Sequence, residues 1–147
     1  MSAKEFLQSI RDAERRIRAI RAMRAHYLEM ACSMTGMSET NIRSTTKRSR
    51  VETAALEMVE LADELGGKAE ELVGMVKKAE AVIAQIENPR YREVLSLRYL
   101  AGKSWAEVAG AMGYRDVHSA HAMHGWALKE FQRKMEKVIV FDKRPVV

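Results

Sequence analysis

The spacing of apolar residues predicts two long helices in the first part of the chain. Near the N-terminus, apolar residues recur in alternating steps of four and three, at Phe6, Ile10, Ala13, Ile17 and Ile20. A longer series has steps of three or four throughout: Ala55, Met58, Ala62, Leu65, Ala69, Leu72, Val76, Ala79, Ile83 and Ile86. Such steps place residues on one side of an α-helix, so both series are expected to pack against other helices.

Local signals set the expected starts of these helices and the segment between them. Ser2-x-x-Glu5 and Ser49-x-x-Glu52 have the spacing of capping boxes, in which hydroxyl and carboxylate groups accept hydrogen bonds from the first N–H groups of a helix. Residues 33–50 are rich in Ser, Thr and basic groups and have no apolar periodicity. We therefore expect a flexible loop over 33–50.

The two helices are expected to fold back on each other as an antiparallel hairpin, a coiled-coil oligomerisation arm over residues 1–87. Gly66-Gly67 weakens the second helix and predicts a kink or a local break there. The second series is longer than the first, so part of it has no partner within the hairpin. A second chain is expected to cover that part, in a homodimer or higher homo-oligomer. The alternative is a monomeric hairpin with an exposed end.

Asn88-Pro89 marks the expected start of a second domain, residues 88–137. Asn is a favourable N-cap and Pro suits the first helical position. Three short helices are expected: 90–100, Ser104 to Gly113, and 116–137. The residues expected to face inward are Val94, Leu95, Leu97, Leu100, Trp105, Val108, Ala109, Met112, Ala120, Met123, Ala127, Leu128 and Phe131. The remaining tail, 138–147, begins with a β-prone apolar run and has no expected placement.

The second and third short helices are separated by Gly113-Tyr114-Arg115, with the small residue Ala109 four positions before the glycine. A short turn with a small residue at the closest approach of two helices is typical of a helix-turn-helix, although other αα-corners share it. The expected fold class is therefore all-α: a long helical hairpin followed by a three-helix helix-turn-helix domain.

Composition supports this fold class and excludes others. The 2 prolines and 8 glycines provide few turns for a sandwich or barrel, and the single cysteine excludes an intrachain disulfide. No apolar stretch has the length of a membrane span, and no secretory signal is recognisable at the N-terminus. The sequence therefore predicts a soluble, cytoplasmic protein with no membrane association.

Charge is distributed unevenly along the chain. Residues 1–32 have seven basic and four acidic side chains, residues 51–87 three and nine, and residues 88–147 eleven and six. Opposite charges on the two long helices favour their pairing, within one chain or between copies. The basic C-terminal part favours a polyanionic partner, in line with a helix-turn-helix.

The segment NPRYREVLSLRYLAGKSWAEVAGAMGY from Asn88 to Tyr114, together with HGWAL at 124–128, resembles the region-4-type helix-turn-helix of sigma factors. The resemblance is greatest to phage-encoded regulators of the RinA/ArpU type, which also have a helical N-terminal arm. It implies a transcription regulator of phage late or packaging genes that binds DNA and is not an enzyme. The chain has no room for a region-2-like domain, so a complete sigma factor is excluded.

If the third short helix enters the major groove, its first turns read the bases and nearby polar groups bind phosphates. The expected base contacts are His118, Ser119, His121 and Ala122. The expected phosphate contacts are Lys103, Ser104, Arg115 and Lys129. Double-stranded DNA is thus the expected partner, with RNA polymerase as a further partner because region-4-like domains can dock on it.

Other chemistry is less well supported by the sequence. His118, His121 and His124 recur every third residue, but a metal site needs a convergent ligand set, so no metal and no cofactor are expected. Trp105 and Trp126 are expected to pack the small domain, and no motif for catalysis is present. Two alternatives stay open: a DNA-recognition protein like phage small terminase subunits, and a protein-interaction module that docks on RNA polymerase.

Overall fold

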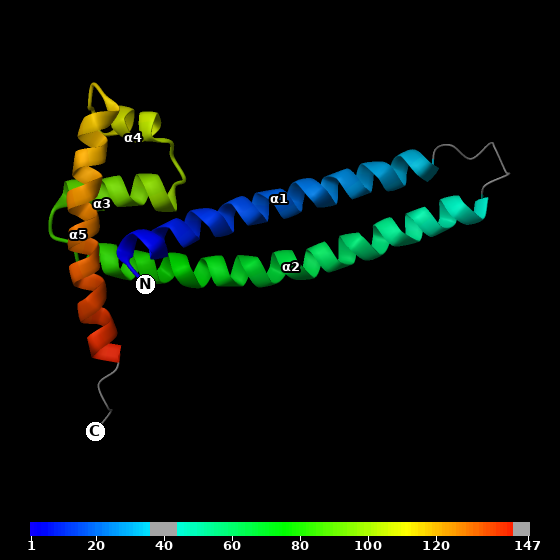
Figure 1. Cartoon of the computed structure of the whole chain (residues 1–147), viewed down its shortest axis with the longest axis horizontal. Coiled ribbons are helices and arrows are strands. Elements are labelled where there is room, and N and C mark those ends of the chain that lie inside the picture. The colour runs from blue at the N-terminus through cyan, green and yellow to red at the C-terminus, as the bar shows by residue number, and fades with distance from the viewer. Residues whose placement is uncertain (36–43, 143–147) are drawn as a thin grey trace. The chain divides into compact units, whose positions relative to one another are not determined.

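The computed structural model describes residues 1–35 and 44–142, and every regular element in these ranges is helical (Figure 1). The predicted all-α class is confirmed. The elements are α1 (Ala3–Thr35), α2 (Ser44–Ala84), α3 (Pro89–Leu95), the π-helical segment η2 (Ser96–Leu100), α4 (Trp105–Ala111) and α5 (Val117–Asp142). They form two compact units, an arm unit of residues 13–72 and a head unit of residues 1–12 and 73–147.

The arm unit contains parts of α1 and α2, which run antiparallel (Figure 1). Ile17 and Ile20 of α1 are buried, as the heptad spacing predicts. On the part of α2 that belongs to the arm unit, the buried residues are Ala54 and Leu61, one position before the predicted series. The shift has a physical reason: burial of Leu61 removes more apolar surface from water than burial of its alanine neighbour.

Three expectations about the arm need correction. The described ends of the expected 33–50 loop are helical, since α1 continues to Thr35 and α2 begins at Ser44, while 36–43 lie outside the described residues. Ser49 therefore lies inside α2, where its carbonyl accepts the Thr53 hydroxyl at 2.8 Å, and it does not cap a helix. The predicted break at 66–67 is absent because the flanking turns, rich in strong helix formers, outweigh a glycine cost of about 1 kcal/mol each.

The head unit begins with the first turns of α1. The capping box is confirmed: the Ser2 N–H donates to Glu5 Oε2 at 2.8 Å, and the Glu5 N–H donates to Ser2 Oγ at 3.2 Å. Leu7 and Ile10 are fully buried, and the Phe6 ring stacks on Phe131 of α5 at 6.3 Å between centroids.

The two compact units divide the chain elsewhere than at the expected boundary after residue 87. Residues 1–12 and the end of α2 belong to the same unit as α3, α4 and α5. The reason is the size of their apolar side chains, since Leu7, Ile83 and Ile86 are buried there.

The three-helix part of the head unit follows the prediction closely. Asn88 caps α3 by accepting the Arg90 N–H at 2.9 Å. The buried side chains include Val94, Leu95, Val108, Ala109, Met112, Ala120, Ala127 and Phe131. Leu97, Leu100, Met123 and Leu128 are only half-buried, and Tyr99 and Met135 are buried in addition.

The chain after residue 137 also differs from the expectation. The β-prone start of the tail, 138–142, continues α5 to Asp142, and residues 143–147 lie outside the described range. Extension of an existing helix adds one backbone hydrogen bond per residue without a new nucleation step, which outweighs intrinsic β-propensity.

Candidate nucleic-acid interface

The connection between α4 and α5 is fixed by hydrogen bonds at both ends. Gly113 has φ +78°, the left-handed conformation that favours glycine, and it ends α4. The Gly113 N–H donates to the Gly110 carbonyl at 3.2 Å, and the Tyr114 N–H donates to the Ala109 carbonyl at 2.8 Å. These two bonds form a Schellman motif, so the short turn predicted for a helix-turn-helix is present.

The first turn of α5 is closed by Asp116. Its Oδ1 accepts the Ser119 N–H at 3.1 Å and the Ser119 hydroxyl at 3.4 Å. Ser119, one of the expected base contacts, is thus part of the helix cap. Both α3 and α4 contact α5, and the small Ala109 is buried in α4 as the helix-turn-helix geometry requires.

The other expected base contacts are exposed on α5 but differ in their surroundings. His118, His121 and Ala122 are all exposed. The His121 ring lies 4.3 Å from the Trp105 ring, which restricts its orientation. Within the described residues, His118 and Ala122 have no hydrogen bond, ion pair or ring contact, so their side chains are available to a ligand.

The four expected phosphate contacts differ in their surroundings. Lys103 Nζ lies 3.7 Å from Glu107 Oε2, and the Ser104 hydroxyl donates to Glu107 Oε1 at 3.1 Å. A carboxylate therefore accompanies both groups at the start of α4. Arg115 and Lys129 are exposed and have no polar side-chain partner in the described ranges. Arg115 and Lys129 are therefore more available to bind phosphate than Lys103 and Ser104.

The two tryptophans differ, although both were expected to pack the domain. Trp105 is half-buried, with the Arg98 guanidinium 4.5 Å above its ring and the His124 ring 4.7 Å away. Trp126 is 54% exposed, so the expectation for it was wrong. Its position on α5 lies about 100° around the helix from the buried Ala127 and about 140° from the buried Phe131, outside the stripe of buried residues.

His124 is buried, whereas His118 and His121 are exposed. Its Nε2 and the Tyr99 hydroxyl form a hydrogen bond of 2.6 Å. Burial, followed by the nearby charges of Arg98, His121 and Lys4, lowers the His124 pKa to about 4. Burial also raises the Tyr99 pKa. Among the described residues, no three His, Cys, Asp or Glu side chains converge as a set of metal ligands.

An arginine network that the sequence does not reveal holds the turn before α4. Arg11 Nη1 donates to the Arg98 carbonyl at 2.8 Å, and Arg98 Nη1 donates to the Lys103 carbonyl at 3.0 Å. Both contacts join residues distant in sequence or in an irregular turn, so residue spacing gives no signal for them. They fix the backbone on which Lys103 and Ser104 lie.

Two further arginines serve the fold. Arg90 Nη2 donates to the Met112 carbonyl at 3.0 Å, with its guanidinium 5.0 Å from the Tyr114 ring, and Arg92 Nη1 donates to the Ile86 carbonyl at 2.6 Å. Part of the basic charge of residues 88–147 is therefore committed to the head unit itself.

None of the helices in the described ranges has the length and apolar character needed to cross a membrane. Comparison with protein-family models, with curated proteins and with solved structures gives no match to this chain.

Proposed function

We propose that this protein binds double-stranded DNA sequence-specifically and regulates transcription, as the resemblance of residues 88–137 to sigma region 4 implies. The genes in question are late or packaging genes of a phage or prophage, and the site of action is the bacterial cytoplasm. The observation that carries the proposal is the turn between α4 and α5, which is held by hydrogen bonds at both ends. This turn positions α5 so that side chains in its first turns are exposed. A recognition helix needs such an exposed side to enter the major groove.

The side chains exposed at the start of α5 are suited to base contacts, and the cationic groups on either side of them are suited to phosphate contacts. The imidazole nitrogens of His118 can form hydrogen bonds with base edges, and the Ala122 methyl suits contact with a thymine methyl. Arg115 and Lys129 add cationic groups before and after these residues. The proposed role needs no cofactor and no catalytic group.

Self-association belongs to the same proposal. A homodimer or higher homo-oligomer places more than one α5 on a duplex, which raises affinity through effective concentration and favours a repeated half-site. Opposite charges on the arm helices support such an assembly.

The test is selection of bound fragments from a random duplex library, repeated over a salt series. Enrichment of one short sequence that survives moderate salt is the expected result. Uniform binding that falls steeply with salt, or no binding, contradicts sequence-specific recognition.

A second candidate function is docking on RNA polymerase, and Trp126 favours it. A tryptophan that is 54% exposed is a typical centre of a protein-protein contact. Co-purification with polymerase that is lost in Trp126→Ala, in a protein that selects no DNA sequence, would favour this candidate over DNA recognition.

A further inference from the structure

The arm unit has two faces of different chemistry, which follow from the positions of its buried residues. In an antiparallel pair of right-handed helices, residues one position after the buried ones lie on the same face of the pair. Residues one position before the buried ones lie on the opposite face, because each residue advances the helix by about 100°. We call these the following face and the preceding face.

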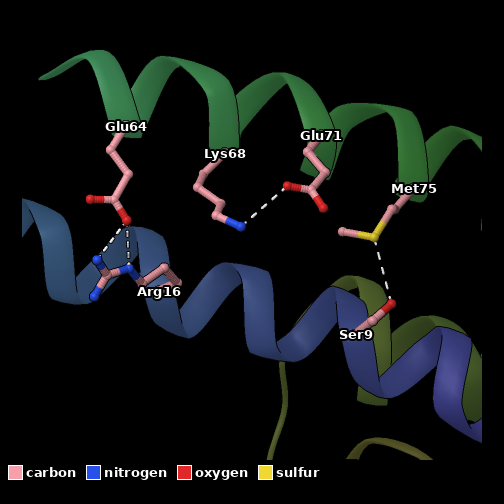
Figure 2. Close-up of polar contacts among 6 residues, drawn as sticks. All are labelled: Ser9, Arg16, Glu64, Lys68, Glu71 and Met75. Carbon is pink, nitrogen blue, oxygen red and sulfur yellow. Dashed lines mark hydrogen bonds and ion pairs between the residues drawn. The ribbon is translucent and has the colours of Figure 1, made fainter. Parts of the chain in front are cut away.

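The preceding face is polar and already has a contact between the two helices. Arg16 precedes the buried Ile17, and Glu64 precedes the half-buried Leu65. Arg16 Nε donates to Glu64 Oε1 at 2.9 Å (Figure 2). On α2 this face continues with acidic groups at Glu57 and Glu71, and Glu71 pairs with Lys68 at 3.4 Å.

Between Ala55 and Ala69 the following face of α2 is apolar and open. It contains Ala55, Val59, Ala62, Gly66 and Ala69. Val59 is 60% exposed, Ala55 is also exposed, and Ala62 and Ala69 are half-buried. A β-branched side chain and several alanines in heptad spacing, exposed on an otherwise acidic helix, have the pattern of a helix-packing surface.

The following face of α1 has the complementary chemistry. It presents Arg18, Arg21, Ala25 and Leu28, all of them exposed, with Leu28 at 51%. Over residues 13–32 α1 has five arginines and two glutamates, whereas residues 51–72 of α2 have seven acidic side chains and one lysine. Contact between α2 helices of two copies would bring like charges together, while α1 of one copy on α2 of another joins opposite charges.

We propose that the following face binds a second copy of this chain. The two arms lie parallel, and α1 of each copy packs on α2 of the other in a four-helix bundle. This arrangement has a two-fold axis along the arm, so both contacts are identical and the assembly closes as a dimer. The apolar residues of α2 are then covered by Ala25 and Leu28 of the other copy.

The intrachain ion pair sets the level of the contacts. With Arg16 opposite Glu64, Arg18 lies at the level of Ala62, because the helices are antiparallel. In the parallel dimer, Arg18 of one copy therefore approaches Asp63 of the other, which borders the following face. Leu28 lies within about one turn of the other copy's Ala55.

The first experiment is sedimentation velocity on the full chain without DNA, over a concentration series. The wild-type protein is expected to form a dimer at micromolar concentration. Val59→Glu is expected to weaken the dimer at least tenfold, whereas Thr53→Glu is expected to change it less than about twofold, because Thr53 is also exposed but lies on the preceding face. Circular dichroism of each variant establishes that its helices are intact.

The second experiment tests the pairing of the two helices by charge exchange. Arg18→Asp and Asp63→Arg are each expected to weaken the dimer, and the double variant is expected to restore it. A wild-type monomer, a ring larger than a dimer, equal effects of the Val59 and Thr53 variants, or no rescue in the double variant each overturns the proposal. This arrangement rests on the self-association that the proposed function includes, but no DNA is involved, so these outcomes are independent of the proposed DNA recognition.

Discussion

The head unit and the arm unit differ in how completely they bury their apolar residues, although both contain parts of the same two helices with heptad spacing. In the head unit Leu7, Ile86 and Phe131 are 0% exposed, whereas in the arm unit Leu28 and Val59 are more than half exposed. The difference follows from the number of helices that meet. Several helices enclose a core, but two helices cover only one side of each other. A closed unit supports a precise site, and an open one requires a partner.

The largest expected effect is the loss of a central side chain from the closed unit. Phe131→Ala removes a ring that is 0% exposed and stacks on Phe6, so we expect a loss of about 3–5 kcal/mol in the free energy of unfolding. Urea denaturation measures it. Trp126→Ala, at an exposed position of the same helix, is the control and is expected to change stability by less than about 0.5 kcal/mol. Equal losses in both variants would mean that the head core is not closed around Phe131.

The second effect is a pH dependence that belongs to the head unit alone. The His124 pKa is lowered from 6.5 to about 4 in the folded state, so the unfolded state binds the proton more readily. Stability is therefore fully present above about pH 6.5 and is lost as the pH falls toward about 4. Between about pH 6.5 and pH 5 the loss amounts to roughly 1.5 kcal/mol.

Denaturation at several pH values in this window measures the effect, with His118→Asn as the control for an exposed histidine. His124→Asn, which has no ionisable group, is expected to flatten the profile. A profile that stays steep in His124→Asn would assign the pH dependence to another group.

The third effect has opposite signs in the two units. Gly113→Ala in the head unit forces an L side chain into φ +78° and is expected to cost about 1 kcal/mol or more. Gly67→Ala in the arm unit is expected to add about 0.5–1 kcal/mol, because Gly67 lies inside α2 and a methyl group added there would meet no neighbouring atom within 4 Å. Thermal denaturation of both variants measures whether stability rises or falls. A stabilised Gly113→Ala variant would contradict the left-handed conformation at Gly113.

The smallest expected effect is a difference in DNA binding between substitutions of two lysines of the head unit. Lys129→Ala is expected to weaken binding to all duplexes and to lower the slope of log affinity against log salt by about one. Lys103→Ala is expected to have a smaller effect, because Glu107 accompanies that ammonium group at 3.7 Å. Binding isotherms over a salt series measure both slopes. A larger effect of Lys103→Ala would show that Glu107 turns away in the complex.

Local features of the fold could be predicted from the sequence, because their causes lie within a few residues. The cap at Ser2, the N-cap at Asn88 and the turn at Gly113 depend on hydroxyl, amide and glycine chemistry at fixed spacing. The extent of the helices was less predictable, since Ser49 has the spacing of a cap but lies inside α2.

Features that depend on tertiary contacts could not be predicted from spacing. The buried side of α2 differs from the predicted one by a single position at Leu61, because α1 selects the larger side chain. The burial of His124 depends on Tyr99, and the backbone at Lys103 depends on Arg11. In each case the partner is distant in sequence, so the spacing of residues along one helix does not predict the contact.

The most direct test of the central claim, that the exposed face of α5 reads DNA sequence, is parallel selection from one random duplex library. The wild-type protein and Ala122→Glu are compared, since Ala122 is exposed and its replacement leaves the core intact. The wild type is expected to enrich one short sequence, and Ala122→Glu is expected to enrich none. Enrichment of the same sequence by both proteins, or of no sequence by the wild type, would contradict it.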